Sequence, residues 1–220
     1  VGRHVTRRSL DYLRHGTDPF AQPLPELFAD ASRARVGRSR PRYSNAGFQL
    51  LGHALATASG VSYADLTATR IAEPLDLSPF YVPDSPADLL PGAVEGHNRG
   101  KIVDPWASEA IGPAGGVRAS VEAMAAFVRA MLAGTAPGVA ALDPVADFSG
   151  PAMRIGAGWM TTDRRAKGLL TWHNGGTGGH RSWLGMRRDL GLGVVALAAT
   201  TASVDDLGLN VIDERANQFS

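Results

Sequence analysis

The chain has 220 residues, of which 44% are hydrophobic and 20% charged, and this length is enough for one globular unit or little more. Its 22 basic and 21 acidic side chains leave a formal charge of +1, so no general field favours nucleic acid or an anionic membrane, and neither is expected as a partner. Cysteine is absent, which excludes disulfides, thiolate metal sites and a cysteine nucleophile.

The N-terminal residues 1–42 are polar and irregular, and the arginine run from Arg33 to Arg42 is expected on a solvated face or loop. One short helix is predicted there, from Pro25 to about Arg35, because proline is favoured in a first turn and apolar residues follow at helical spacing. Two helices come next. The first runs from Ala46 to a stop at Gly60, and the second runs from a Ser62 capping box to the break near Pro74.

A long connection, Leu77 to Pro113, follows these helices. It is rich in proline, glycine, aspartate and serine and has no sustained period, so only a short strand pair near Val94 and Ile102 is expected within it. A further helix is predicted from the Ser120 cap to Leu132, because its apolar residues fall on one face.

The hydrophobic period changes to two after a proline- and glycine-rich linker. Four short runs separated by turn residues indicate an antiparallel meander, and a last helix from the Ser203 cap carries apolar residues that can lie against it. The predicted fold class is α+β of the α/β sandwich type, with a mostly helical domain in residues 1–145 and the antiparallel sheet with its C-terminal helix in residues 146–220. The four runs are Ile155–Thr161, Gly168–His173, Arg181–Arg187 and Leu192–Ala199.

Missing motifs exclude several enzyme classes. No serine stands in a Gly-x-Ser-x-Gly elbow, and the Gly100-Lys101 pair has Glu95 where a phosphate-binding loop needs glycine. The histidines form no His-Glu-x-x-His pair, so neither a metal site nor a cofactor is expected. The longest apolar stretch, Leu192 to Ala199, is too short to cross a membrane, and Val1 opens no signal peptide. Compartment and oligomeric state are left open.

Tyr43-Ser44-Asn45 stands directly before the helix predicted from Ala46. A tyrosine at this place holds its phenol at a helix N-terminus, where the dipole and the unpaired N–H groups favour the ionised form and help it act as a base. The alternative is that Tyr43 packs and Asn45 caps the helix. These three residues alone do not decide between the two interpretations.

The segment from Trp172 to Gly179 is the second with chemical interest, and it reads Trp-His-Asn-Gly-Gly-Thr-Gly-Gly. Glycines this dense let a backbone approach a ligand closely and turn its N–H groups outward, which suits a strand edge that receives a substrate carbonyl. The alternative is a plain flexible hairpin.

Taken together, these segments resemble the serine β-lactamase and penicillin-binding-protein-like hydrolases, in the branch of the class C β-lactamases, D-alanyl-D-alanine carboxypeptidases and esterases. The resemblance covers roughly residues 40 to 215, and its pieces occur in the order that the family has. The pieces are Tyr43-Ser44-Asn45-Ala46-Gly47-Phe48, Leu50-Leu51-Gly52-His53-Ala54-Leu55, Glu73-Pro74-Leu75, Ala114-Gly115-Gly116-Val117, Gly156-Ala157-Gly158-Trp159 and His173-Asn174-Gly175-Gly176-Thr177-Gly178-Gly179.

The resemblance implies an acyl-enzyme serine hydrolase that acts on a small-molecule ester, amide or peptide, with a site between an α/β domain and a helical domain. Tyr43 would shuttle protons to and from the nucleophile, and Asn45 would hydrogen-bond the substrate amide. His173 would stand where the family has the lysine of Lys-Thr-Gly, and Gly175 would be the glycine of that motif. Gly176 would lend a backbone N–H to the oxyanion hole.

Two departures from the family pattern limit this prediction. Asn174 replaces the usual threonine or serine, which weakens any claim to bind a β-lactam carboxylate. The nucleophilic Ser-x-x-Lys is absent, because neither Lys101 nor Lys167 has a serine three residues before it. We therefore expect an incomplete fold in which Val1 lies inside the domain, and the first helix, two strands and the nucleophile precede it. The alternative is an inactive fragment or pseudoenzyme that serves as a binding or structural domain.

Overall fold

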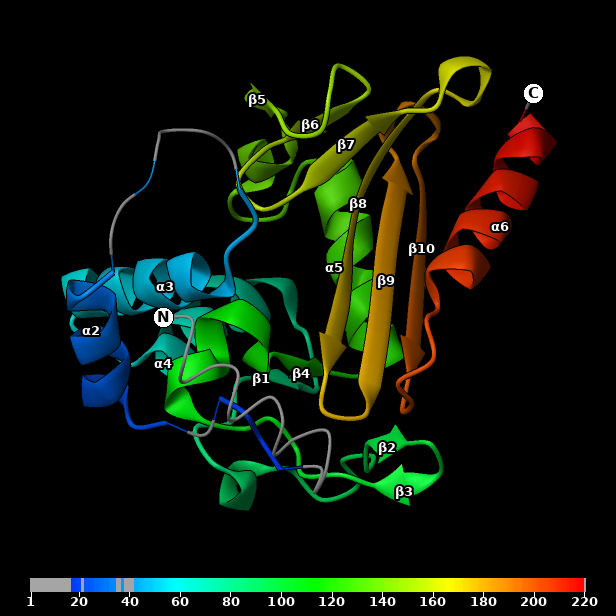
Figure 1. Ribbon diagram of the computed structural model, residues 1–220. Helices are drawn as coiled ribbons and strands as arrows, with labels where there is room; N and C mark the ends of the chain where they lie inside the picture. The colour runs from blue at the N-terminus through cyan, green and yellow to red at the C-terminus, as the bar shows by residue number, and fades with distance from the viewer. Residues whose placement is uncertain (1–16, 21, 35–36, 38–41, 220) are drawn as a thin grey trace.

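The computed structural model describes residues 17–20, 22–34, 37 and 42–219 (Figure 1). Helices α2 (Leu24–Ser32), α3 (Asn45–Ser59) and α4 (Tyr63–Thr67) gather on one side of the molecule, and helical turns at Ala68–Ala72 and Glu73–Leu75 continue from α4. These positions confirm the three helices predicted for this part of the chain. Helix α2 ends at Ser32, with Arg33 at its C-cap, before the predicted end near Arg35. Most of the arginine run lies outside the described residues.

Side-chain caps set the start of α3 and of α4. The Oγ of Ser44 accepts a hydrogen bond from the backbone N–H of Gly47 at 3.0 Å, so Ser44, and not Asn45, caps α3. This leaves the side chain of Asn45 available for another partner. At the start of α4, the Oγ of Ser62 accepts from the backbone N–H of Asp65 at 3.0 Å and donates to its carboxylate at 2.8 Å.

The connection after α4 is mostly irregular, as predicted. Strands β2 (His97–Asn98) and β3 (Lys101–Ile102) form the expected short pair. A second pair, β1 (Phe80–Tyr81) with β4 (Arg118–Ala119), was not predicted, because strands of two residues carry no readable period. Helical turns in and after this stretch, among the described residues, are Pro86–Asp88, η4 (Glu109–Ile111), η5 (Gly112–Gly116), Val139–Leu142, Arg165–Lys167, Arg188–Leu190 and Asn217–Phe219.

The main sheet has six antiparallel strands in the order β10-β9-β8-β7-β6-β5. The long strands agree with the predicted meander, but the run Ile155–Thr161 is not one strand. Its backbone turns over Gly156–Trp159, where the N–H of Gly156 donates to the carbonyl of Trp159 at 2.8 Å, so the run is divided between two strands. The strands are β5 (Ala146–Asp147), β6 (Met153–Ile155), β7 (Met160–Asp163), β8 (Leu169–Thr177), β9 (His180–Arg187) and β10 (Leu192–Ala198).

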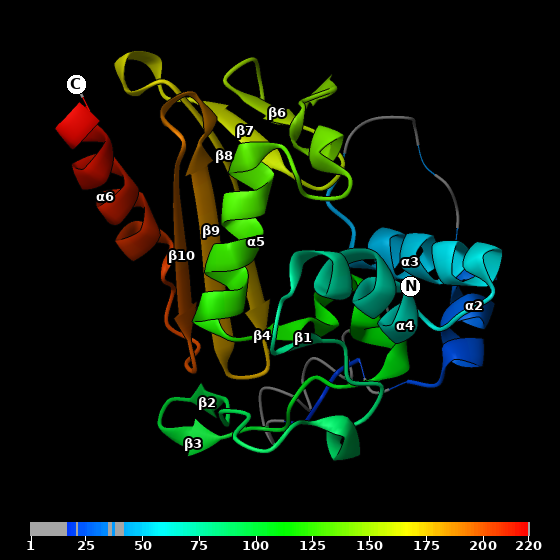
Figure 2. The same cartoon turned by 180° about the vertical axis from the view of Figure 1, so that it is seen from behind.

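Helices cover the two faces of this sheet. Helix α5 (Val121–Ala133) starts after the Ser120 cap, as predicted, and lies across one face, as Figure 2 shows. On that face Leu184 and Met186 of β9 pack against Val128 and Met131 of α5. Because neighbouring side chains of a strand point to opposite faces, Trp183 of β9 faces the other layer.

The C-terminal helix α6 (Asp205–Ala216) forms that other layer. Its Ile212 packs with Trp183 and Leu170 in a second core cluster. Ser203 accepts a hydrogen bond from the backbone N–H of Asp205 at 3.1 Å, although Val204 holds the cap position. The fold is therefore of the predicted α+β class, an antiparallel sheet with a C-terminal helix packed on it beside a mostly helical part. The division at residue 145 stays a prediction.

Candidate functional site

The two segments singled out in the sequence meet in the fold. Tyr43 lies just before α3 and is 57% exposed, and His173 lies half-buried on β8. Their ring centroids are 6.2 Å apart and their ring planes are tilted by 31°. A helix start and a strand separated by about 130 residues are thus brought together at one place. Asn45 follows Tyr43 by two residues, is the first residue of α3 and is half-buried.

Two glycine-containing segments complete the surroundings of this pair. Turn η5 packs against both α3 and β8, and a Cβ added to Gly115 in η5 would lie 3.5 Å from the methyl group of Thr177 on β8. The turn between β6 and β7 approaches α3, since a Cβ added to Gly158 would lie 3.3 Å from the ring of Phe48. The segments of the sequence resemblance around Tyr43, Gly115, Gly158 and His173 therefore converge on the junction between α3 and β8.

The edge of β8 is open beside this junction. Strand β7 pairs with β8 only over Leu169–Trp172, whereas β9 pairs with it as far as Thr177. Among the described residues, the stretch His173–Thr177 therefore has a strand partner on one side only. In an antiparallel strand, alternate backbone N–H groups point away from such a partner, so this edge offers donors to a ligand. Gly175 and Gly176 lie on this stretch, beyond the predicted end of the run at His173, because β8 continues to Thr177.

The alternation of β8 separates His173 from Asn174. Thr171 and His173 share the face on which α5 packs, and Asn174 points to the face of α6. The side-chain amide of Asn174 donates to the carboxylate of Asp205 at 2.9 Å. The residue that departs from the family pattern is thus tied to the last helix.

Gly175 and Gly176 are small because side chains of β9 occupy the space beside them. Gly175 is paired with Ser182 and Gly176 with Arg181. A Cβ added to Gly176 would lie 2.8 Å from the guanidinium carbon of Arg181, whose Nε donates to the backbone carbonyl of Thr201 at 3.2 Å. Neither position therefore has room for a side chain, and the strand backbone carries none there.

Burial lowers the pKa of His173 below its ordinary value, and a backbone hydrogen bond at Asn174 opposes this in part. The cause is the cost of removing an imidazolium ion from water. His173 is therefore neutral at pH 7, unlike the lysine in whose place it stands in the sequence resemblance.

The part of the chain that the structure describes contains no candidate metal site and no candidate membrane-spanning helix. No three histidine, aspartate or glutamate side chains there gather as metal ligands. None of the helices there has the length and apolar character needed to cross a bilayer.

Sequence reasoning missed three contributors to this site. Phe48 and Gly158 touch across the junction, and Asp205 holds Asn174. The sequence resemblance includes Phe48 and Gly158 but gives neither a role, and their approach across the junction has no signal in a single sequence. The sequence gives no signal for the role of Asp205 either, because it looks like an ordinary acidic residue in the first turn of a helix.

Comparisons with known proteins bear on the family and the fold. The family model described as Beta-lactamase matches residues 5–217. A crystal structure of a β-lactamase/D-alanine carboxypeptidase from Yersinia pestis, complexed with citrate, is 21% identical with a TM-score of 0.72, and the match covers 92% of this chain and 63% of that one. A class C β-lactamase is 18% identical with a TM-score of 0.76, and the match covers 90% of this chain and 64% of that one.

A class C β-lactamase from Rhodobacter sphaeroides is 20% identical, with a TM-score of 0.73 and coverage of 90% and 66%. A search of curated proteins found no match. The chain spans less than two thirds of the first two of these solved structures. Because the family model matches nearly the whole chain, the chain belongs to the serine β-lactamase and penicillin-binding-protein-like family.

Proposed function

We propose that the chain is the downstream portion of a serine hydrolase that forms and hydrolyses an acyl-enzyme, acting on an ester, a D-amino-acid peptide or a β-lactam. The observation that carries this proposal is the approach of Tyr43 to His173, 6.2 Å between ring centroids, at the open edge of β8. Membership of the family supports the reaction class.

Tyr43 acts as the proton shuttle in this proposal. Its phenol is exposed at the junction, where a nucleophile and a substrate from solvent can both reach it. Asn45 follows two residues later with a side chain that the Ser44 cap leaves free, and it donates to the substrate amide.

The β8 edge binds the substrate acyl group. Gly175 and Gly176 leave the strand backbone accessible, and an N–H of Gly176 stabilises the oxyanion that forms when the nucleophile attacks. A preorganised donor of this kind contributes roughly 10²- to 10³-fold to kcat. His173 lines the same edge as a neutral group at pH 7.

The nucleophile comes from a segment outside these 220 residues. Neither lysine of the chain has a serine three residues before it, so the residues described above can bind and polarise a substrate but cannot be acylated through this motif. A longer parent chain with Ser-x-x-Lys upstream of Val1 is therefore the form in which activity is expected.

The test uses such a parent, a substrate with a neutral ester and a ligand pair consisting of a carboxylate and its methyl ester. We expect turnover of the neutral ester. We also expect the carboxylate to bind no better at pH 8 than at pH 7, and to bind more tightly as the pH falls below about 6.5, because only then does the imidazole of His173 gain its charge. The methyl ester should show little of this dependence.

The matched control is His173→Gln, which keeps a polar side chain and removes the titrating charge. This variant should bind the carboxylate with the same flat pH profile as the methyl ester. A parent that turned over none of a neutral ester, a D-amino-acid peptide and a β-lactam would contradict the proposed function. Identical pH profiles for both ligands in the unmodified parent would remove His173 from the site and leave the hydrolase proposal to the remaining residues.

A further inference from the structure

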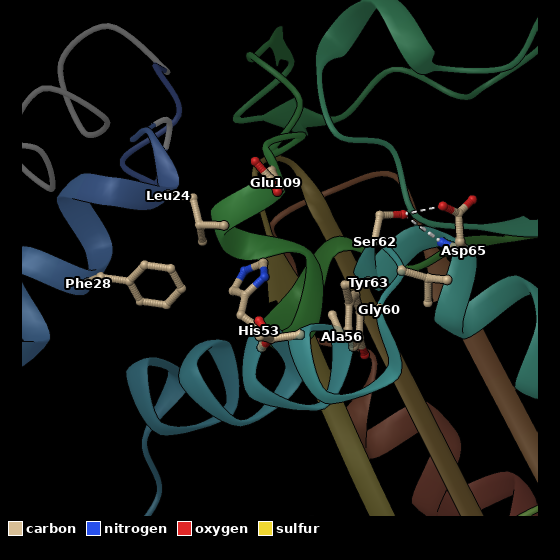
Figure 3. A pocket seen from close by; sticks show the side chains of 11 residues that line it. Leu24, Phe28, His53, Ala56, Gly60, Ser62, Tyr63, Asp65 and Glu109 are labelled. Carbon is tan, nitrogen blue, oxygen red and sulfur yellow. Dashed lines mark hydrogen bonds between the residues drawn. The ribbon is translucent and has the colours of Figure 1, made fainter.

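A pocket of about 480 Å³ lies away from the Tyr43 and His173 junction, between α2, the C-terminal half of α3, the start of α4 and η4 (Figure 3). Its volume is within the range of small-molecule sites. One wall is apolar and the other carries acidic groups. The apolar wall includes Leu24, Phe28 and Ala56, and the acidic groups are Asp65 and Glu109.

His53 is the residue of this pocket that requires explanation. It is 4% exposed on α3, and its Nε2 atom is buried without a hydrogen-bond partner among the described residues. Figure 3 shows its imidazole rising from α3 into the space between Phe28 and Glu109. The ring is held there by edge contacts with Phe28 and Tyr63, at centroid distances of 6.2 and 6.4 Å. A buried polar atom left unpaired is costly, so this one calls for a partner.

The electrostatic field at the pocket favours a cation. Among the described residues that line it, two carry carboxylates and none is an arginine or a lysine. Asp84 belongs to the same acidic surroundings: burial raises its pKa, the carboxylates of Glu109, Asp88 and Asp65 raise it further, and His53 lowers it in part. The carboxylate of Asp65 is fixed by the hydroxyl of Ser62, while Glu109 is exposed beside the opening.

We propose that this pocket binds a primary ammonium ligand with an apolar body. The ammonium group donates one N–H to Nε2 of His53, in the tautomer that carries its proton on Nδ1, and another to the carboxylate of Glu109. The apolar body lies on Leu24 and Phe28, and the aromatic faces of Phe28 and Tyr63 favour the cation further. The site is separate from the catalytic junction and does not depend on the proposed hydrolysis.

The test titrates the 220-residue chain with 2-phenylethylammonium and with 2-phenylethanol, a neutral probe of nearly the same shape. We expect the ammonium, which has nine heavy atoms, to bind this open site with a Kd of about 1 mM, and the alcohol to bind at least about fivefold more weakly. The imidazole NMR signals of His53, assigned with His53→Gln, should shift on addition of the ammonium.

The decisive variant is Glu109→Gln, because Glu109 is exposed and its replacement leaves the fold intact. It should weaken ammonium binding about fivefold and leave alcohol binding unchanged. Glu122→Gln removes the same charge from an exposed position on α5 outside the pocket, and it should change neither. Equal binding of both probes, equal effects of the two variants, or no saturation up to about ten times the expected Kd would overturn the proposal. The last result would mean that an ordered water alone satisfies Nε2 of His53.

Discussion

Replacing Tyr43 by phenylalanine is expected to lower kcat of the Ser-x-x-Lys parent by roughly 10²- to 10⁴-fold, the usual loss when a general acid and base is removed. The ring contact with His173 does not need the hydroxyl, so the site geometry and the substrate KM should change little. Steady-state kinetics on a neutral ester measure both quantities.

Tyr81→Phe is the matched control for this prediction. Its hydroxyl accepts a hydrogen bond from the backbone N–H of Leu90 at 3.0 Å, in the connection and away from the junction. The same chemical change at Tyr81 should leave kcat within about twofold of the parent value. A Tyr43→Phe parent that keeps its full kcat would return Tyr43 to a packing role.

The largest effect on stability is expected from Trp183→Ala, which should lower the free energy of unfolding by about 3–5 kcal/mol. Trp183 is 1% exposed and fills the space between β9 and α6. Gly185 and Gly208 are bare where its ring lies, because an added Cβ at either position would come within 3.0 Å of ring atoms. Removal of the indole leaves a cavity that these two backbone segments cannot fill.

Trp183→Phe separates the volume of the side chain from its polar atom. The indole Nε1 is buried and has no hydrogen-bond partner among the described residues, so its loss breaks no bond. Phenylalanine should therefore cost less than alanine in urea unfolding. An alanine variant within about 1 kcal/mol of the wild-type chain would show that the layer between β9 and α6 is not a packed core.

Local chemistry made the helices and the long strands predictable. The Ser120 cap and the terminal Gly134 bound α5, and turn residues separate β8, β9 and β10. The prediction of the sheet was wrong where these turn signals are weak. The alternating run from Ile155 was interpreted as one strand because side-chain period alone does not reveal that Gly156–Trp159 turns back on itself.

The candidate site was only partly predictable from the residues. The position of Tyr43 before a helix indicates a possible base, and the density of glycines indicates a possible ligand-binding edge on β8. Neither pattern predicts that the two segments lie together. That proximity depends on long-range packing through η5. Only the sequence resemblance predicted it. The bond between Asn174 and Asp205 and the unpaired imidazole of His53 were invisible for the same reason, since both arise from tertiary contacts.

The most direct test of the central claim is intact-mass spectrometry after incubation with a fluorophosphonate, performed on the 220-residue chain and on a parent extended to include Ser-x-x-Lys. The account predicts an unchanged mass for the 220-residue chain, because it assigns to Tyr43, Asn45 and His173 the task of assisting a Ser-x-x-Lys nucleophile, and that motif does not occur in these residues. It predicts one adduct on the parent, at the serine of that motif. A stoichiometric adduct on any serine within residues 1–220 would contradict it.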